Sequence, residues 1–302
     1  MNTGTLIDPS FADTQIMSRL DPLQFDAGEF GQSFSRRPFR ISHSLCDNPL
    51  FELPRLLELA GQLPENHIEY NAGKLPLTVD QSLTPANGLS VEETVRRIEE
   101  CESWMVIKWV HHDPAYAELL DACLRQIRPL TEQITPGMRQ PQAYIFLTSP
   151  GSVTPYHIDP EHNFLLQIRG SKKVHMFDGS DSRVLSDRDF ERFYSEKTRN
   201  LEFREEFRDH GWEFNLQSGQ GLHFPVTFPH YVENGPEVSV SFSITFRTPD
   251  LERRRMVYQC NHRLRRMGLK PGGWGRSALA DQLKYQAVRV TSKLGRMLGR
   301  GD

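Results

Sequence analysis

The feature that most constrains the fold is a change in the pattern of apolar and turn residues at Gln140. From there to about residue 248, short apolar runs such as QAYIFLTS, NFLLQIRG and VSVSFSITF are separated by turn residues roughly every ten positions. Regular spacing of this kind indicates an antiparallel sandwich or barrel rather than alternating strands and helices. We therefore predict a mainly β core over residues 140–248.

Sequence patterns typical of helices flank this core on both sides. Residues 1–139 are expected to form helices and strands that pack on the core, after an irregular arm over residues 1–35. The elements predicted there are a strand at 37–45, a helix at 48–63, a long loop at 71–89, a helix opened by a capping box of Ser90 and Glu93 and running to Cys101, a strand at 103–110, and a helix from Pro114 to about Pro129. A charged helical insertion is predicted from Ser186 to Phe207, and residues 249–302 are predicted to form basic helices interrupted at Pro271.

The charge is unevenly distributed along the chain. The net charge is −3, but residues 251–302 contain thirteen Lys and Arg residues and three acids, which leaves about −13 on the remainder. Such a basic segment can bind an acidic partner or a membrane surface. The favoured interpretation is simpler: a helical face that docks on the acidic body or on a second subunit. No helix-turn-helix or zinc-finger pattern is present, so nucleic acid is not the expected partner.

The compartment is expected to be a reducing cytoplasm. Cys46, Cys101, Cys123 and Cys260 form no CxxC pair and no zinc-ligand spacing. The first fifteen residues lack the basic start and apolar stretch of a signal peptide. No run approaches the 18 or so apolar residues needed to span a membrane.

The stretch Thr154-Pro155-Tyr156-His157-Ile158-Asp159 carries the main candidate site. In a strand, residues two apart point to the same face, so His157 and Asp159 can serve one metal ion. His230, which precedes the alternating run at 238–246, is the best third ligand. Two histidines and one carboxylate suit Fe(II) and leave open positions for a 2-oxo acid and O₂, whereas zinc prefers closed tetrahedral sites.

A lysine near the metal strand supplies a candidate anion site. Lys172 begins the run KKVHMF and could point inward, where a buried ammonium would need a carboxylate partner. Lys173 is its rival, because a shift of one residue exchanges the two faces. Hydroxyl groups of Thr154, Tyr144 and Ser241 could donate to the same carboxylate.

At this point the run TPYHIDPEHNFLLQIRGSK resembles the jumonji-type (JmjC, cupin-like) family, which includes the asparaginyl hydroxylase of the hypoxia response. The resemblance is close over 140–178 and 216–247. It implies a double-stranded β-helix (jelly-roll, cupin) core with helical additions at both ends, and C-terminal helices that form a homodimer. It also implies Fe(II), 2-oxoglutarate and O₂ as cofactors. The residues to which it assigns roles are His157, Asp159 and His230 as metal ligands, Lys172 and Thr154 as cosubstrate-binding residues, and Asn163 near the oxygen site.

The expected function is hydroxylation of a C–H bond in a protein side chain, peptide or small metabolite, with release of succinate and CO₂. One alternative is a non-catalytic cupin that senses a metal or ligand, and another is a metal-dependent cupin of a different reaction class. Specificity is expected to lie in segments 71–89 and 178–212. Most of the eleven histidines are expected to have no functional role; His162, for example, is expected to face solvent.

Overall fold

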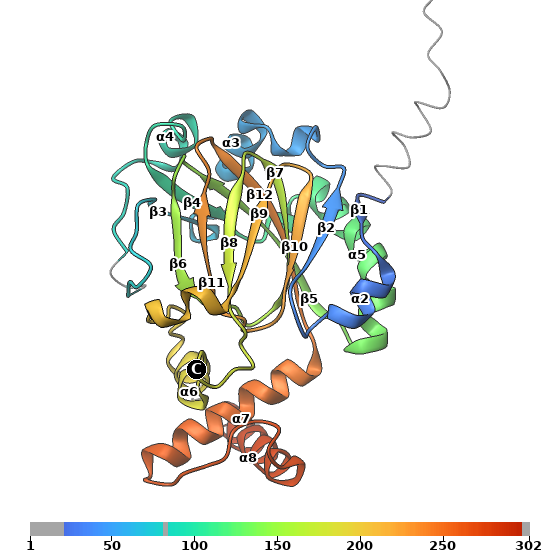
Figure 1. Cartoon of the computed structure of the whole chain (residues 1–302), viewed down its shortest axis with the longest axis vertical. Coiled ribbons are helices and arrows are strands. Elements are labelled where there is room, and N and C mark those ends of the chain that lie inside the picture. Colours follow the sequence, from blue (N-terminus) through green and yellow to red (C-terminus); the bar gives the residue numbers. More distant parts are fainter. Residues whose placement is uncertain (1–20, 81–83, 298–302) are drawn as a thin grey trace, which may run out of the picture.

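The computed structural model describes residues 21–80 and 84–297, and its core consists of two antiparallel sheets that face each other (Figure 1). The strands are β1 (Leu23–Gln24), β2 (Phe39–His43), β3 (Ile68–Ala72), β4 (Ser103–Ile107), β5 (Arg139–Thr148), β6 (Val153–His157), β7 (His162–Arg169), β8 (Lys172–Met176), β9 (Trp212–Leu216), β10 (Gln220–Phe224), β11 (His230–Asn234) and β12 (Ser239–Arg247). The larger sheet has the order β1-β2-β10-β7-β12-β5-β4-β3, and the smaller has the order β6-β11-β8-β9. From β5 onward the chain alternates between the sheets, with only β8 and β9 as sequential neighbours in one sheet. The predicted fold class, a mainly β jelly roll with helical additions, is confirmed.

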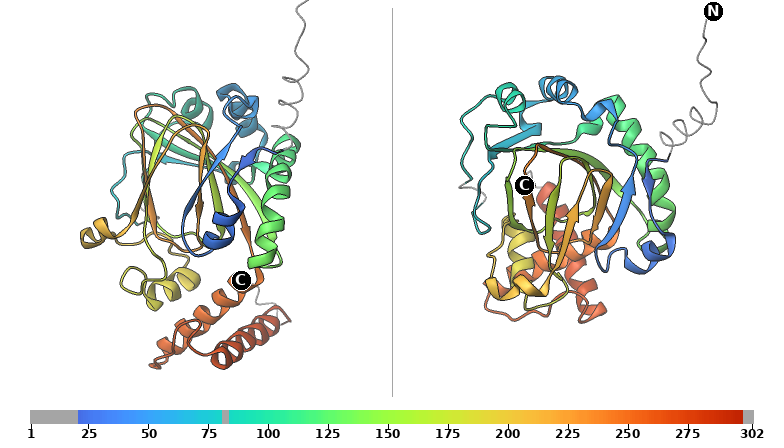
Figure 2. Two further views of the ribbon diagram at one scale, coloured as in Figure 1. Left: turned by 45° about the vertical axis from the view of Figure 1, so that its right-hand side comes forward. Right: turned by 45° about the horizontal axis from the view of Figure 1, so that its top comes forward.

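Helices cover the outside of the sandwich and extend beyond it. They are α2 (Ala27–Ser33), α3 (Leu53–Gln62), α4 (Val91–Arg96), α5 (Pro114–Ile134), α6 (Asp187–Glu196), α7 (Pro249–Arg266) and α8 (Ala278–Met297), with short 3-10 helices η1 (Pro49–Phe51), η2 (Glu65–His67), η4 (Val110–His112) and η5 (Glu205–His210). Figure 2 shows α2 and α5 beside the larger sheet and α7 and α8 projecting from one end of the sandwich.

The two faces of β12 show why the larger sheet is covered on one side and hollow on the other. Val240, Phe242, Ile244 and Phe246 point outward and pack with apolar residues of α2, α3 and α5 in the main core. The alternate residues, Ser239 to Thr245, face the smaller sheet. Period-two alternation thus gives one sheet an apolar outer face and a polar inner face.

The N-terminal region departs from the prediction in one respect. It was expected to pack on the core, but β2 pairs with β10 and β4 pairs with β5, so its strands extend the larger sheet. The edges of β10 and β5 would otherwise expose unpaired backbone groups, which natural sheets cover. A boundary at residue 139 therefore cuts through a continuous sheet.

Three local predictions in this region are wrong. Residues 23–24 form β1 and residues 27–33 form α2, whose N-cap Asp26 accepts a hydrogen bond from the Glu29 amide, where an irregular arm was expected; the rest of that arm, residues 1–20, lies outside the described residues. Helix α4 ends at Arg96 instead of Cys101. Helix α5 continues through Pro129 to Ile134, because buried Ile127 and Thr131 keep that face packed while proline removes only one backbone donor.

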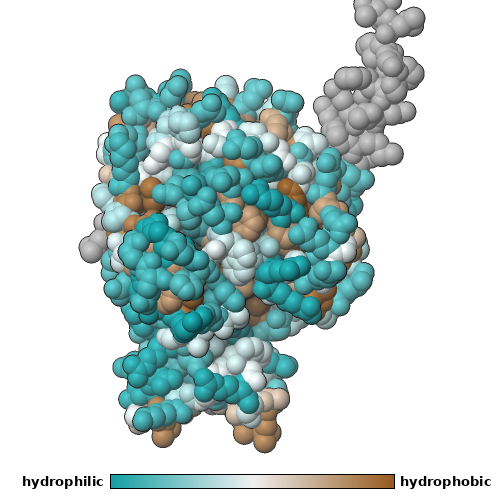
Figure 3. Space-filling model, viewed as in Figure 1, coloured by the Kyte–Doolittle hydropathy of each residue, from teal (hydrophilic) through white to brown (hydrophobic). Residues whose placement is uncertain are grey.

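The C-terminal helices form a hairpin attached to the rest of the chain through α6. A buried carboxylate, Glu191 of α6, is held by Arg265 of α7 at 2.7 Å. On α8, Leu279, Leu283 and Val290 are 72%, 63% and 56% exposed, and Figure 3 shows apolar atoms at the far end of the hairpin. Within residues 21–80 and 84–297, no helix is both long and apolar enough to cross a membrane.

Candidate metal centre and active site

Strand pairing brings the three predicted ligands together although 73 positions separate His157 from His230 along the chain. His157 ends β6 and His230 begins β11, and the two residues are direct partners in the register of these strands. Asp159 lies two residues beyond the end of β6. Its Oδ2 atom is 3.8 Å from Nε2 of His157 and 3.7 Å from Nε2 of His230. Among the described residues, this is the one set of three His, Cys, Asp or Glu side chains that could hold a metal ion.

Backbone carbonyls orient both imidazole rings. Nδ1–H of His157 donates to the Pro155 carbonyl at 2.6 Å, and Nδ1–H of His230 donates to the Phe228 carbonyl at 2.9 Å. A carbonyl can only accept, so the proton resides on Nδ1 and the lone pair on Nε2 faces the shared centre. Burial lowers the pKa of both histidines, so both rings are neutral at pH 7.

Arg199 determines which oxygen of Asp159 remains available. Its Nη2 atom lies 2.5 Å from Oδ1, while Oδ2 faces the two imidazoles. Burial by itself would raise the pKa of Asp159, but the charge and hydrogen bond of Arg199, together with the electrostatic effect of the two imidazoles, outweigh it and lower the pKa to about 2. The three groups are therefore in the protonation states that metal ligands need. Two imidazole nitrogens and one carboxylate oxygen, grouped on one side of a common centre, fit Fe(II).

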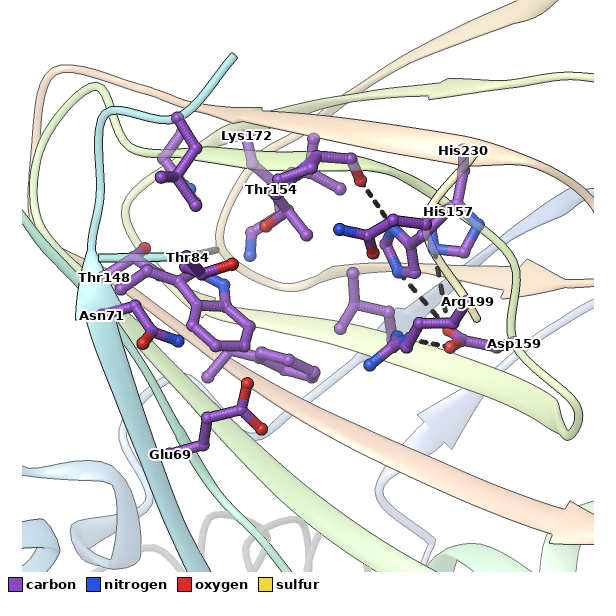
Figure 4. A pocket seen from close by; sticks show the side chains of 18 of the residues that line it. Glu69, Asn71, Thr84, Thr148, Thr154, His157, Asp159, Lys172, Arg199 and His230 are labelled. Carbon is purple, nitrogen blue, oxygen red and sulfur yellow. Dashed lines mark hydrogen bonds and ion pairs between the residues drawn. The ribbon is translucent and has the colours of Figure 1, made fainter. Parts of the chain in front are cut away.

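The same cavity holds the predicted anion-binding lysine (Figure 4). Lys172, Thr154 and Asn163 line it together with the three metal-site residues. Lys172 is only 6% exposed, and burial, with no acid contributing, lowers its pKa to about 7. Lys173 points to the opposite face, where its Nζ is 3.3 Å from Glu213. The register therefore turns Lys172, not Lys173, toward the metal site.

Two predicted cosubstrate residues are not part of the cavity wall. Tyr144 and Ser241 lie on the inner face of the larger sheet, but neither lines the cavity. The Tyr144 hydroxyl donates to Gln142 at 2.6 Å, and the Ser241 hydroxyl donates to Gln167 at 2.7 Å. Both hydroxyls are thus used within their own sheet, because the inner face is wider than the cavity and period-two alternation cannot show which inward residues reach it.

Some wall residues were not predicted from the sequence. Trp104 and Thr148 line the cavity from β4 and β5 of the larger sheet, which faces the smaller sheet that contains the metal strand β6; inward-facing positions on β4 and β5 were the available signal. Arg199 and Asn200 come from an extended segment after α6 that lies along β6, with the Ile158 amide donating to the Arg199 carbonyl at 3.1 Å. No periodicity marks this segment, and the predicted helical insertion actually ends at Glu196.

His162 also differs from its prediction. It is fully buried on the outer face of the larger sheet, with its ring 4.9 Å from Phe34 and 5.0 Å from Phe246. Neither ring nitrogen has a hydrogen-bond partner in the described part of the chain, and burial lowers its pKa to about 4. It belongs to an aromatic cluster away from the metal centre.

Comparisons with known proteins agree with this geometry. A model of the cupin-like domain family matches residues 91–252, which is more than half of the chain and includes all three candidate ligands. JmjC domain-containing protein D of Dictyostelium discoideum is 34% identical over 101 residues, covering 31% of this chain and 22% of that protein. Jumonji C domain-containing protein 5 of Drosophila melanogaster is 31% identical over 124 residues, covering 37% of this chain and 29% of that protein. The matches thus span less than a third of the length of either relative.

A solved structure supports the fold. The X-ray structure of Escherichia coli ycfD aligns with a TM-score of 0.50 and 16% identity, covering 89% of this chain and 68% of that one. Given the family match over residues 91–252, this chain belongs to the cupin-like domain family, and part of it is similar to the two JmjC domain-containing proteins.

Proposed function

We propose that this protein is an Fe(II)- and 2-oxoglutarate-dependent oxygenase that hydroxylates a C–H bond. The observation that carries the proposal is the pairing of two features in one cavity: a group of two neutral histidines and one ionised carboxylate, and a buried lysine whose pKa is not perturbed by any acid among the described residues. The first suits ferrous iron, and the second suits the distal carboxylate of a dicarboxylic 2-oxo acid.

The residues divide the work of binding. His157, Asp159 and His230 would hold the iron, and Lys172 would attract the distal carboxylate of 2-oxoglutarate. When bound, iron with these cosubstrates supplies oxidising power: one oxygen atom of O₂ enters the substrate as a hydroxyl group, and the other enters succinate as 2-oxoglutarate loses CO₂. The chain itself contributes position, charge and shelter from solvent.

Three contacts would set the geometry of the metal ligands. The carbonyls of Pro155 and Phe228 hold both histidines in the Nδ1–H tautomer. Arg199 holds Oδ1 of Asp159 and so favours binding through Oδ2 alone. A single carboxylate oxygen as ligand leaves more of the coordination sphere open to the cosubstrates.

The substrate is expected to enter past the two segments already assigned to specificity. Thr84 of the first segment and Arg199 and Asn200 of the second line the cavity. Peptides, protein side chains and small metabolites all remain candidate substrates. Formation of succinate against pools of peptides and amino acids is the screen that would identify the class.

Anaerobic titration with Fe(II) and 2-oxoglutarate tests the proposal. A weak charge-transfer band should appear in the visible region, and it should disappear in His157→Ala and Asp159→Ala. Lys172→Ala should weaken 2-oxoglutarate binding, whereas Lys173→Ala should leave it unchanged. Retention of the band in both metal-site variants, or equal effects of the two lysine variants, would contradict the proposal.

A further inference from the structure

The cavity end that contains Lys172 also holds polar atoms that lack partners. Thr148 is 2% exposed, and its Oγ1 atom has no hydrogen-bond partner in the described part of the chain. The indole Nε1 of Trp104 is likewise buried and unpartnered among those residues. Both side chains line the cavity. Buried polar groups in proteins are nearly always hydrogen-bonded, so two such atoms on one wall indicate a missing ligand.

Strand register places these groups at the same end of the cavity. Trp104 and Thr148 are direct partners on β4 and β5. Lys172 is the partner of Asn234 on β11, and Asn234 donates through Nδ2 to the Ser152 carbonyl at 2.9 Å.

Ser152 links the Lys172–Asn234 pair to the Trp104–Thr148 pair, because its hydroxyl donates to the carbonyl of Ser103, the neighbour of Trp104, at 3.2 Å. The metal site lies toward the other end of β8, where Met176 pairs with His230. Met176 lies four positions along the strand from Lys172, about 13 Å of backbone. Figure 4 shows Thr148, Thr154 and Lys172 on one side of the cavity and the metal-site residues on the other.

The chemistry of this end selects an anion. An ammonium and an indole N–H can only donate, and a threonine hydroxyl can donate as well as accept. Glu69 is the acid nearest these strands on the cavity wall, but its carboxylate is 2.6 Å from Lys108 and does not perturb the pKa of Lys172. The Oδ1 atom of Asn234, which also has no partner among residues 21–80 and 84–297, is an acceptor suited to the ammonium. A carboxylate can accept hydrogen bonds from all three donors at once.

We propose that Thr148 and Trp104 complete the anion site of Lys172 by donating hydrogen bonds to the distal carboxylate of the 2-oxo acid. This inference rests on the proposed function and deepens it. Thr148 and Trp104 would thus donate the hydrogen bonds that were predicted from the sequence for Tyr144 and Ser241. The site so formed selects a dicarboxylic over a monocarboxylic 2-oxo acid.

Calorimetric binding to the Mn²⁺-loaded protein tests the inference in Thr148→Val and Trp104→Phe. The probes are 2-oxoglutarate and 2-oxopentanoate, which has a methyl group in place of the distal carboxylate. Each variant should bind 2-oxoglutarate about tenfold more weakly, the usual loss for one hydrogen bond to a charged group. Binding of 2-oxopentanoate should stay within about twofold of wild type, because that probe cannot use the missing donor.

Thr245→Val is the matched control. The Thr245 hydroxyl is also buried and unpartnered in the described chain, but Thr245 does not line the cavity. Both valine variants should unfold at a temperature equal to or above that of wild type, because each removes an unsatisfied buried hydroxyl. Only Thr148→Val should lose affinity for 2-oxoglutarate.

The outcomes separate this inference from the proposed function. Wild-type affinity for 2-oxoglutarate in both Thr148→Val and Trp104→Phe, with loss in Lys172→Ala, would overturn the inference and leave the oxygenase proposal standing. Equal weakening of both probes would also overturn it, since a change of cavity shape would then explain the effect. Wild-type affinity in Lys172→Ala would instead overturn the proposed function.

Discussion

Replacing Lys172 by methionine should stabilise the metal-free protein, even though it should weaken the binding of 2-oxoglutarate. Lys172 is 6% exposed, and burial lowers the pKa of its ammonium from 10.5 to about 7. Methionine fills a similar volume without a charge, and exchanging a buried charge for an apolar side chain is often stabilising. The buried lysine should therefore destabilise the metal-free fold while it strengthens the binding of 2-oxoglutarate.

The magnitude follows from the two pKa values. Because the unfolded chain binds the proton more tightly, the stability linked to this residue is present above pH 10.5 and is lost as the pH falls through about 7. At about 1.4 kcal/mol per pKa unit, the loss is about 4 kcal/mol at pH 7 and about 1.5 kcal/mol at pH 9.5. The gain from Lys172→Met should therefore be larger at pH 7 than at pH 9.5.

Urea unfolding of the metal-free protein at these two pH values measures the effect. Lys173→Met is the matched control, because Lys173 is 41% exposed and pairs with Glu213 at the surface. Its free energy of unfolding should change by less than about 1 kcal/mol. If Lys172→Met is no more stable than wild type at pH 7, or if its gain does not shrink at pH 9.5, the reasoning is refuted.

Three further predictions concern other parts of the molecule. As the pH falls from 6.5 to about 4, the wild-type protein should lose about 3 kcal/mol of unfolding free energy through His162, because the buried ring takes up a proton only on unfolding. His162→Phe should remove this loss, and urea midpoints across this pH range would reveal it. Thr227, a buried β-branched residue, has a φ of 59°, so Thr227→Gly should raise the free energy of unfolding by about 1 kcal/mol; a decrease in thermal midpoint would contradict this. We also propose that the exposed apolar face of α8 mediates a homodimer, so Leu283→Lys should shift the mass measured by light scattering toward the monomer, and an unchanged mass would count against this face.

Much of the fold could be predicted from local sequence patterns. The ten-residue spacing of apolar runs after Gln140 predicted the β core, and the capping box at Ser90 and Glu93 is present as predicted. The short helix α2 was missed, although Asp26 and Glu29 have the spacing of an N-terminal cap. Strand β3 was missed because its run IEYNA mixes polar and apolar residues at the edge of a sheet, where packing gives weak patterning.

The candidate site divides in the same way. His157 and Asp159 are two residues apart, so their proximity could be inferred from local geometry. The choice between Lys172 and Lys173 could not be made locally, because a shift of one residue inverts the face of a strand. It required the pairing of β8 with β11.

Arg199, Trp104 and Thr148 depend on contacts that no local pattern encodes. Arg199 reaches Asp159 from a segment without periodicity, 40 positions further along the chain. Trp104 and Thr148 become wall residues only because β4 and β5 lie next to each other in the larger sheet. Similarly, the hydroxyls of Tyr144 and Ser241 face inward as alternation predicts, yet are used by Gln142 and Gln167.

The order of residues was enough to predict a candidate site: two histidines, one aspartate and a lysine in strands that alternate inward and outward. Alternation is a property of a single strand and can be seen in the order of residues. The tertiary structure decided which inward residues meet, since sheet order and register join segments far apart along the chain. The closure of His230 onto His157 across β6 and β11 is the contact on which the metal centre depends.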